Sequence, residues 1–387
     1  MTRRKIKFLC AVLVLCLGVG GTAVEAKDSS QKKNTEKWDE AVHTPYGKYP
    51  ETVTYTLGKI SGANNSNLPL GETYEDNAYT QYLKKMLNIQ NQDIFEMEDG
   101  TSYEQAIEMA IEDNDIPDIL VVKGRENLKK LVSRDLVEDL SAVYEECATD
   151  RIKEMYESYG EDLLDSAIFD GKLYAFPDKP YLLTGQTQRK TLESYKNWQY
   201  VVVRKGYEHP EIIGKYVSVL FDYTRYEDRN ASDINDYFSL NVDPTARPLN
   251  INVDYWDGLY RTTENIQAAL DGALHIQELT GIEKAYYQTC KSYMNETLTT
   301  VNGWAAYASR IQAVSLLAES GRGTRSLSMG DADGEIPQYL QKLETETFLQ
   351  IICGEKPVEY FDQFVEEWYE SGGESLTRQV QEGYSGT

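Results

Sequence analysis

"IPDILVV", at residues 116–122, is the stretch that decides the fold of this chain. Pro117 ends the helical pattern that precedes it, and residues 118–122 form a short apolar run that is typical of a buried parallel strand. Parallel strands are joined by crossover connections, which are usually helices. The stretch therefore predicts a sheet with helices on its faces.

The sequence around this strand alternates between strand and helix patterns. Residues 52–57 ("TVTYTL") and 89–97 ("IQNQDIFEM") predict two more strands, and residues 79–87 predict a helix between them. Residues 102–115 have the apolar stripe of an amphipathic helix, and residues 200–205 ("YVVVRK") predict a further strand. This alternation predicts an α/β lobe with a largely parallel sheet.

"FDGKLYAFP", at residues 169–177, predicts a tight turn followed by a short strand. Asp170-Gly171 is a two-residue turn signal, because glycine tolerates the positive φ that hairpin turns require. Leu173 and Ala175 then alternate with their neighbours as in a half-buried strand, and a proline stops the run.

Helix patterns dominate the second half of the sequence. The predicted helices cover residues 208–223, 281–296, 303–319, 337–354 and 357–384. In the last of them, four large apolar side chains recur at helical spacing, namely Phe361, Phe364, Val365 and Trp368. This stripe predicts that the C-terminal helices pack back onto the body as part of its core.

The N-terminus predicts export from the cytoplasm. Residues 1–26 combine a basic start, an apolar run too short for a comfortable membrane span, and small residues ahead of a cleavage point after Ala26. An uncleaved or lipidated anchor is the alternative, although neither Cys10 nor Cys16 follows a lipid-modification box. Residues 27–50 are polar without a period and predict a flexible tether, so we expect a secreted or cell-surface protein.

The chain is strongly acidic. Its formal net charge is −24, and removing residues 1–26, with four basic residues and one glutamate, makes it about −27. Such a charge repels nucleic acid and anionic membrane surfaces, and disfavours anionic ligands unless a local basic patch outweighs it. Solubility alone explains the charge equally well.

The cysteines predict neither zinc nor a disulfide framework. Cys147, Cys290 and Cys353 remain after cleavage, are widely spaced and form no CxxC pair, so at most one disulfide is possible. We expect all three to be small buried hydrophobes.

No catalytic constellation stands out from the sequence, which predicts a protein that is not an enzyme and needs no cofactor or metal. The three histidines, His43, His209 and His275, lie apart, and no GxSxG, HExxH or phosphate-binding glycine loop is present. With 63 Asp and Glu residues, a glycosidase-like carboxylate pair is indistinguishable from a solvated surface. "GDADGE" (330–335) lacks calcium-loop spacing and predicts a surface turn.

Several stretches, in order, resemble the family 1 extracellular solute-binding proteins of ABC-type importers. The resemblance is to the subgroup common in Gram-positive bacteria, which is similar to lipoproteins that bind oligosaccharides, including alginate-like ones. It rests on the ordered set of residues 47–59, 72–89, 116–122, 135–146, 169–177, 201–211, 343–354 and 359–380. It implies a two-lobed, type II periplasmic-binding-protein-like α/β fold with hinge strands that closes on a sugar.

One departure from this family is large. Members usually carry a long central segment after the strand that corresponds to residues 169–177, whereas here a short stretch leads almost directly into the strand at 200–205. The second lobe is therefore expected to be truncated. The predicted divisions are 1–26 (signal peptide), 27–50 (tether), 51–180 (first lobe), 181–335 (shortened second lobe and hinge return) and 336–387 (C-terminal helices).

Two general rules select candidate binding residues. Ligands of open α/β sheets lie at the carboxyl ends of strands, and sugar sites combine aromatic rings with amide and charged side chains. The selected residues are Lys59, Ser61, Asn64, Asn65, Lys123, Arg125, Tyr174, Phe176, Asp254, Tyr255, Trp256, Trp304 and Tyr307. For each of them an ordinary place in the core or in a loop is the alternative.

The sequence thus predicts a monomeric substrate-binding component of a carbohydrate importer, with a small-molecule ligand, expected to be an oligosaccharide, and ABC permease subunits as its partners. The alternative is a degenerate solute-binding scaffold that acts as a cell-surface sensor or interaction module. A polysaccharide-degrading enzyme would need a catalytic constellation that the sequence does not display.

Overall fold

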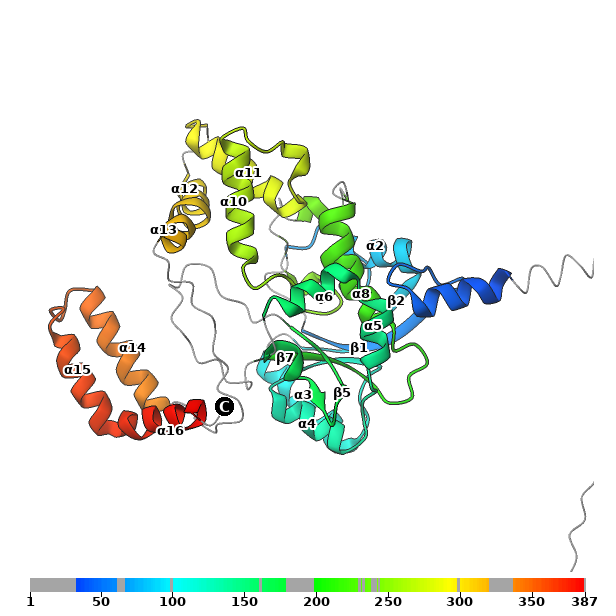
Figure 1. Ribbon diagram of the computed structural model, residues 1–387, viewed down its shortest axis with the longest axis horizontal. Coiled ribbons are helices and arrows are strands. Elements are labelled where there is room, and N and C mark those ends of the chain that lie inside the picture. Colours follow the sequence, from blue (N-terminus) through cyan, green and yellow to red (C-terminus); the bar gives the residue numbers. More distant parts are fainter. Residues whose placement is uncertain are drawn as a thin grey trace, which may run out of the picture.

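The structure is a computed structural model, shown in Figure 1. The residues that it describes are 33–60, 67–97, 100–159, 162–178, 198–228, 231, 234–237, 242, 244–297, 300–319 and 337–385. The predicted signal peptide, the candidate residues Ser61, Asn64 and Asn65, and the turn at 330–335 lie outside this part of the chain.

A five-stranded sheet in the order β2-β1-β3-β7-β6 forms the centre of the fold. β1 pairs in parallel with β2 and β3, whereas β7 runs antiparallel to both β3 and β6. The strands are β1 (Val53–Ile60), β2 (Ile89–Met97), β3 (Ile119–Lys123), β6 (Phe176–Pro177) and β7 (Gln199–Val203). The prediction of an α/β fold is confirmed, but the sheet is mixed rather than largely parallel, because both pairs that β7 makes are antiparallel.

Helices lie on both sides of this sheet, as Figure 1 shows, which is why β3 and β7 are almost entirely apolar. The helices of this region are α2 (Ala78–Leu87), α3 (Gly100–Asp113), α4 (Arg125–Ser133), α5 (Ser141–Cys147), α6 (Asp150–Glu157), α7 (Asp162–Asp165) and α8 (Ile212–Val217). Asn77 begins α2 with a capping box, and Asn88 in the left-handed conformation ends it before β2.

Asp118 ties the three central strands together. Its carboxylate accepts bonds from the backbone N–H (2.8 Å) and hydroxyl (2.7 Å) of Thr56 in β1, and from the guanidinium of Arg204 (2.6 Å), which follows β7. Burial alone would raise the pKa of Asp118, but these donors outweigh it and lower the pKa below its usual value. The carboxylate therefore helps fix the register at which β1 meets β3.

The predicted turn at Asp170-Gly171 is confirmed. Both residues have positive φ (51° and 75°), and they connect β4 (Ile168–Phe169) to β5 (Lys172–Leu173) in an antiparallel pair. The chain then enters β6, which completes the sheet beside β7.

The predicted tether over 27–50 is wrong for the residues that the structure describes there. Residues 33–43 form a helix, and Trp38 on this helix stacks on His209 with the ring centroids 5.7 Å apart. The segment is a folded part of the body, although its polar composition carries no periodic signal.

Lys215 on α8 explains why this segment is ordered. Its side chain is 0% exposed, and its ammonium donates hydrogen bonds to the carbonyls of Ala41 (2.6 Å), Thr44 (2.7 Å) and Gly47 (2.8 Å). The last turn of a helix leaves carbonyls without partners, and a cation there is favourable. Burial lowers the pKa of Lys215 to about 8, so the amine is still mainly protonated at neutral pH.

A second, smaller core forms among the helices that follow. Its buried residues are Ile266, Ala269, Leu279, Tyr287, Cys290 and Ile311. The elements after α8 are η2 (Ser218–Glu227), η3 (Pro244–Ala246), α10 (Gly258–Leu270), η4 (Ile276–Glu278), α11 (Gly281–Met294), α12 (Val301–Tyr307), η5 (Ala308–Ala313) and α13 (Val314–Glu319). Whether these helices act as a truncated second lobe stays a prediction.

The C-terminal helices pack on one another and lie apart from the sheet in Figure 1. They are α14 (Gln338–Ile352), α15 (Tyr360–Trp368), η6 (Tyr369–Gly373) and α16 (Glu374–Ser385). Phe348 contacts the rings of Phe361 and Phe364 at centroid distances of 6.0 and 5.6 Å. Of the predicted apolar stripe, Phe364 is buried while Phe361 remains 44% exposed. Packing of these helices on the body stays a prediction.

The cysteines are all free thiols in the part of the chain that the structure describes. Cys147 and Cys290 are buried, as predicted, whereas Cys353 is exposed because it follows the last turn of α14. No helix among the described residues combines the length and the apolar character needed to cross a membrane.

Candidate functional site

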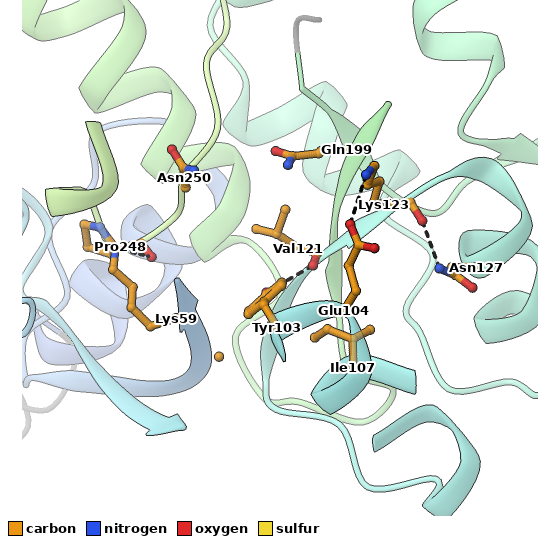
Figure 2. A pocket seen from close by; sticks show the side chains of 11 residues that line it. Lys59, Tyr103, Glu104, Ile107, Val121, Lys123, Asn127, Gln199, Pro248 and Asn250 are labelled. Carbon is orange, nitrogen blue, oxygen red and sulfur yellow. Dashed lines mark hydrogen bonds and ion pairs between the residues drawn. The ribbon is translucent and has the colours of Figure 1, made fainter. Parts of the chain in front are cut away.

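A cavity of about 240 Å³ opens at the edge of the sheet where β1 and β3 end and β7 begins. Figure 2 shows the side chains that surround it. They come from both strand ends, from α3 and α4, and from the loop after η3: Gly58, Lys59, Tyr103, Glu104, Ile107, Val121, Lys123, Asn127, Gln199, Pro248 and Asn250. This edge is where open α/β sheets bind their ligands.

Gly58 lines the cavity at an irregularity in the β1–β2 pair. The register between β1 and β2 shifts between Leu57 and Gly58, and a Cβ built on Gly58 would collide with the ring of Phe95 on β2. Only glycine therefore allows this ring to lie against the β1 backbone at this position.

Lys59 lies at the buried end of the cavity. Its side chain is 1% exposed, and its ammonium donates to the carbonyls of Arg247 and of Pro248 (3.3 Å). These bonds hold the loop after η3 against the end of β1. On the neighbouring strand, burial raises the pKa of Asp93 to about 6, although hydrogen bonding and the charge of Lys59 partly oppose this shift.

One wall of the cavity is apolar and aromatic. Tyr103 and Ile107, four residues apart on the same face of α3, lie beside Val121 of β3. The Tyr103 hydroxyl donates to the Val121 carbonyl (3.1 Å), which fixes the ring in place. This wall offers a contact surface for the carbon–hydrogen face of a ligand.

Opposite charges meet at the outer part of the cavity. Lys123 Nζ lies 3.0 Å from Glu104 Oε1, and their side chains are 44% and 49% exposed. Figure 2 shows the two side chains directed toward each other from β3 and α3. Asn127 of α4 donates to the Lys123 carbonyl (2.9 Å) and so supports the end of this strand.

Carboxamide side chains complete the lining. Lys123 and Gln199 are cross-strand partners in the β3–β7 pair, which brings Gln199 to the cavity. With its amide nitrogen facing the acceptors, Gln199 donates to Asp178 (3.1 Å) and to the Asn250 carbonyl (3.3 Å). The side chain of Asn250 itself faces the cavity beside them.

The arrangement combines the polar and apolar surfaces of a small-molecule binding site. Its lining supplies hydrogen-bond donors and acceptors beside an apolar wall, and the lining carboxylate is engaged by a lysine. Within the described ranges, no three His, Cys, Asp or Glu side chains are grouped so that they could hold a metal ion.

The structure brings two of the predicted site residues, Lys59 and Lys123, into this cavity. Arg125 is not among the lining residues: its Nε donates to the Ser166 carbonyl (2.9 Å), and its guanidinium lies 4.7 Å from the centroid of the Phe169 ring.

The aromatic residues after the hairpin turn do not reach the cavity lining. Tyr174 is half-buried and contacts the ring of Phe169. Phe176 is fully buried between Tyr144 and Tyr156, so its prediction as a ligand contact needs correction. The physical reason is that β6 pairs with β7 and directs the Phe176 ring into the core.

The candidates from the second half of the chain also lie outside the cavity lining. Tyr255 donates to Glu154 (3.1 Å) and is mostly buried, whereas the neighbouring Asp254 lies near Arg225 (3.7 Å). The remaining candidates are Trp256, which is 40% exposed, Trp304, which is 53% exposed, and Tyr307, whose ring contacts Tyr293. Their role as ligand contacts stays a prediction.

Sequence reasoning missed most of the lining. The missed residues are Gly58, Tyr103, Glu104, Ile107, Val121, Asn127, Gln199, Pro248 and Asn250. The strand-end rule points to loops, whereas Tyr103 and Glu104 lie on a helix that returns past the strand ends. The apolar stripe of α3 includes Ile107 and predicts a place for it in the core. The same stripe could have located the apolar wall of the cavity.

Comparisons with known proteins find likeness only to solved structures. No protein-family model and no curated protein matches this chain. The galacto-N-biose/lacto-N-biose I-binding protein of the ABC transporter from Bifidobacterium longum is 18% identical (TM-score 0.20), over 33% of this chain and 28% of that protein. A sugar transporter from Rhizobium etli in an open conformation is 20% identical (TM-score 0.23), over 33% and 29%.

A third structure is matched over a longer stretch. The extracellular solute-binding protein family 1 from Alicyclobacillus acidocaldarius is 10% identical (TM-score 0.37), over 85% of this chain and 100% of that one. The first two matches span less than a third of the length of the proteins concerned.

Proposed function

We propose that this chain is the extracellular substrate-binding component of an ABC-type importer and captures a carbohydrate without changing it covalently. The observation that carries the proposal is the cavity at the ends of β1 and β3, lined by three carboxamide side chains beside a tyrosine and an apolar wall. The ordered sequence resemblance to solute-binding proteins supports the same function.

The chemistry of the lining suits a sugar. A hydroxyl group both donates and accepts, and a carboxamide offers both complements within one side chain, as at Asn127 and Asn250. The carbon–hydrogen face of a sugar ring would lie on the wall formed by Tyr103 and Ile107. At about 240 Å³ the cavity is smaller than the roughly 300 Å³ at which drug-sized sites begin. It therefore suits about one ring of a longer ligand.

The proposed mechanism is capture followed by delivery. The sugar enters the cavity at the edge of the sheet, and the shortened second lobe covers the part of the sugar that protrudes. The closed monomer then meets its permease subunits at the membrane. The free energy of sugar binding favours the closed conformation over the open one, and the permease recognises the closed conformation. Secretion through residues 1–26 would place the protein on the correct side of the membrane.

Calorimetry and thermal unfolding against a panel of neutral and acidic mono- and oligosaccharides test this function. A binding sugar at 100 times its Kd should add about 2.7 kcal/mol to the free energy of unfolding and raise the Tm by several degrees. Asn250→Ala should weaken that response by about tenfold in Kd, because it removes a lining amide. Asn295→Ala, the same change at an exposed residue after α11, is the matched control and should leave it unchanged.

Other outcomes identify other functions. An absence of any shift across the panel would contradict sugar capture, and release of reducing ends would indicate an enzyme. The shortened central region favours one alternative in particular, a degenerate scaffold that acts as a sensor or interaction module at the cell surface. Sugar binding combined with unimpaired sugar uptake by a deletion strain would support that alternative.

A further inference from the structure

The ion pair at the cavity rim joins α3 to β3, the strand that follows it in the chain. Lys123 is the last residue of β3, and Glu104 lies one turn into α3. Their charged atoms are 3.0 Å apart while both side chains remain about half exposed. A ligand entering the cavity therefore meets an ammonium and a carboxylate side by side.

The charges in the cavity lining determine how the Lys123–Glu104 ion pair affects an incoming ligand. The lining contains two lysines and one carboxylate. Lys59 is turned away from an incoming ligand, because its buried ammonium donates to the carbonyls of Arg247 and Pro248. Lys123 is the lining ammonium that stands at the rim, and Glu104 neutralises it.

A neutralised lysine favours one class of sugar over another. A ligand carboxylate that approached Lys123 would come within a few ångströms of the Glu104 carboxylate, and like charges at such a distance are costly. A pair of neighbouring hydroxyl groups meets no such repulsion, since one accepts from Lys123 while the other donates to Glu104. The acidic chain as a whole, with a net charge of −24, adds a weaker long-range repulsion of anions.

We propose that Glu104 is a specificity-determining residue, which makes the cavity select neutral sugars and reject uronates by neutralising Lys123. The proposal rests on the proposed function, because it concerns which sugars the same cavity accepts. It narrows the oligosaccharide class to uncharged members.

The test compares neutral sugars with their uronate counterparts, which carry one carboxylate on each ring. Calorimetry at low ionic strength is carried out with galactose and galacturonate, with glucose and glucuronate, and with the trisaccharides of galactose and galacturonate. The wild-type protein should bind the neutral member about tenfold more tightly or better. Glu104→Gln keeps the shape of the side chain and should reduce this ratio to within about threefold by exposing the charge of Lys123.

Two further variants sharpen the result. Glu112→Gln makes the same change of charge on the same helix, at an exposed residue outside the cavity lining, and should leave the ratio unchanged. Lys123→Gln leaves Glu104 without its lysine and should raise the ratio above the wild-type value. The two rim substitutions thus move the selectivity in opposite directions, which a general loss of folding would not do.

The outcomes separate the two proposals. A ratio that Glu104→Gln leaves unchanged, or a wild-type preference for uronates, would overturn the role of Glu104 while sugar capture stands. If none of these sugars binds to any variant, the role of Glu104 is overturned, whereas the proposed function is overturned only if the full sugar panel also gives no response.

Discussion

Lys215 shows how a single buried side chain can organise a whole segment. Its three hydrogen bonds to the carbonyls of Ala41, Thr44 and Gly47 hold residues 33–50 on the body. Such carbonyls would otherwise be buried without partners, which costs about 1–3 kcal/mol each.

Substitution of Lys215 by Met is expected to release this segment. Methionine keeps most of the length of the side chain but donates no hydrogen bond, so the free energy of unfolding in urea should fall by about 3 kcal/mol or more. Amide exchange over residues 33–50 should quicken as well. Lys205→Met, which removes a lysine from an exposed pair with Glu138 (3.5 Å), should have a far smaller effect, and equal losses would contradict this account.

Asp93 should make stability depend on pH. Because burial raises its pKa from 3.8 to about 6, the folded protein binds a proton more tightly than the unfolded chain between those values. Asp93 therefore contributes most stability below pH 3.8, and this contribution is lost as the pH rises through about 6.

A comparison of Asp93→Asn with the wild type measures this contribution to the free energy of unfolding. The variant should be more stable than the wild type by about 1 kcal/mol at pH 7.5, after allowance for the partial exposure of the site. The advantage should disappear near pH 4, where the aspartate is protonated in the folded protein. Parallel curves of unfolding free energy against pH for the two proteins would show that Asp93 is not the group responsible.

At the scale of elements, the β1–β2 pair depends on the contact between Gly58 and Phe95. Gly58→Ala should lower the free energy of unfolding by about 2 kcal/mol, because the new methyl group collides with the Phe95 ring and forces the strands apart. Phe95→Leu should restore part of the loss when the two substitutions are combined. A double-mutant cycle in urea measures this interaction, and strictly additive effects would contradict the proposed contact.

The sequence was informative about elements where the signal is local. Residues 89–97 and 118–122 carry strand patterns that the structure confirms, and Asp170-Gly171 forms the predicted hairpin turn. The periodicity of α3 also located that helix correctly.

Features that depend on distant partners could not be predicted in this way. The segment at 33–50 reads as a tether because the lysine that binds it is more than 160 residues away along the chain. Gln199 and Glu104 reach the cavity only because β7 pairs with β3 and α3 returns beside them. The burial of Phe176 likewise results from strand pairing, which the sequence pattern of a single strand does not reveal.

At the scale of the whole molecule, the C-terminal helices offer a direct test of how the parts depend on one another. The strongest contacts of α14 to α16 are among themselves. Removal of residues 337–387 should therefore leave the thermal unfolding of the sheet core and its response to sugar within error of the full chain. A marked loss of either property would instead support the sequence-based prediction that these helices pack on the body.

The position of β7 along the chain also affects how the sheet can form during synthesis. β7 lies between β3 and β6 in the sheet but follows both along the chain. A ribosome that has released only the first 178 residues therefore presents two strands with bare edges and a gap between them. Such an intermediate is prone to aggregation until residue 203 has emerged and β7 can pair with both strands.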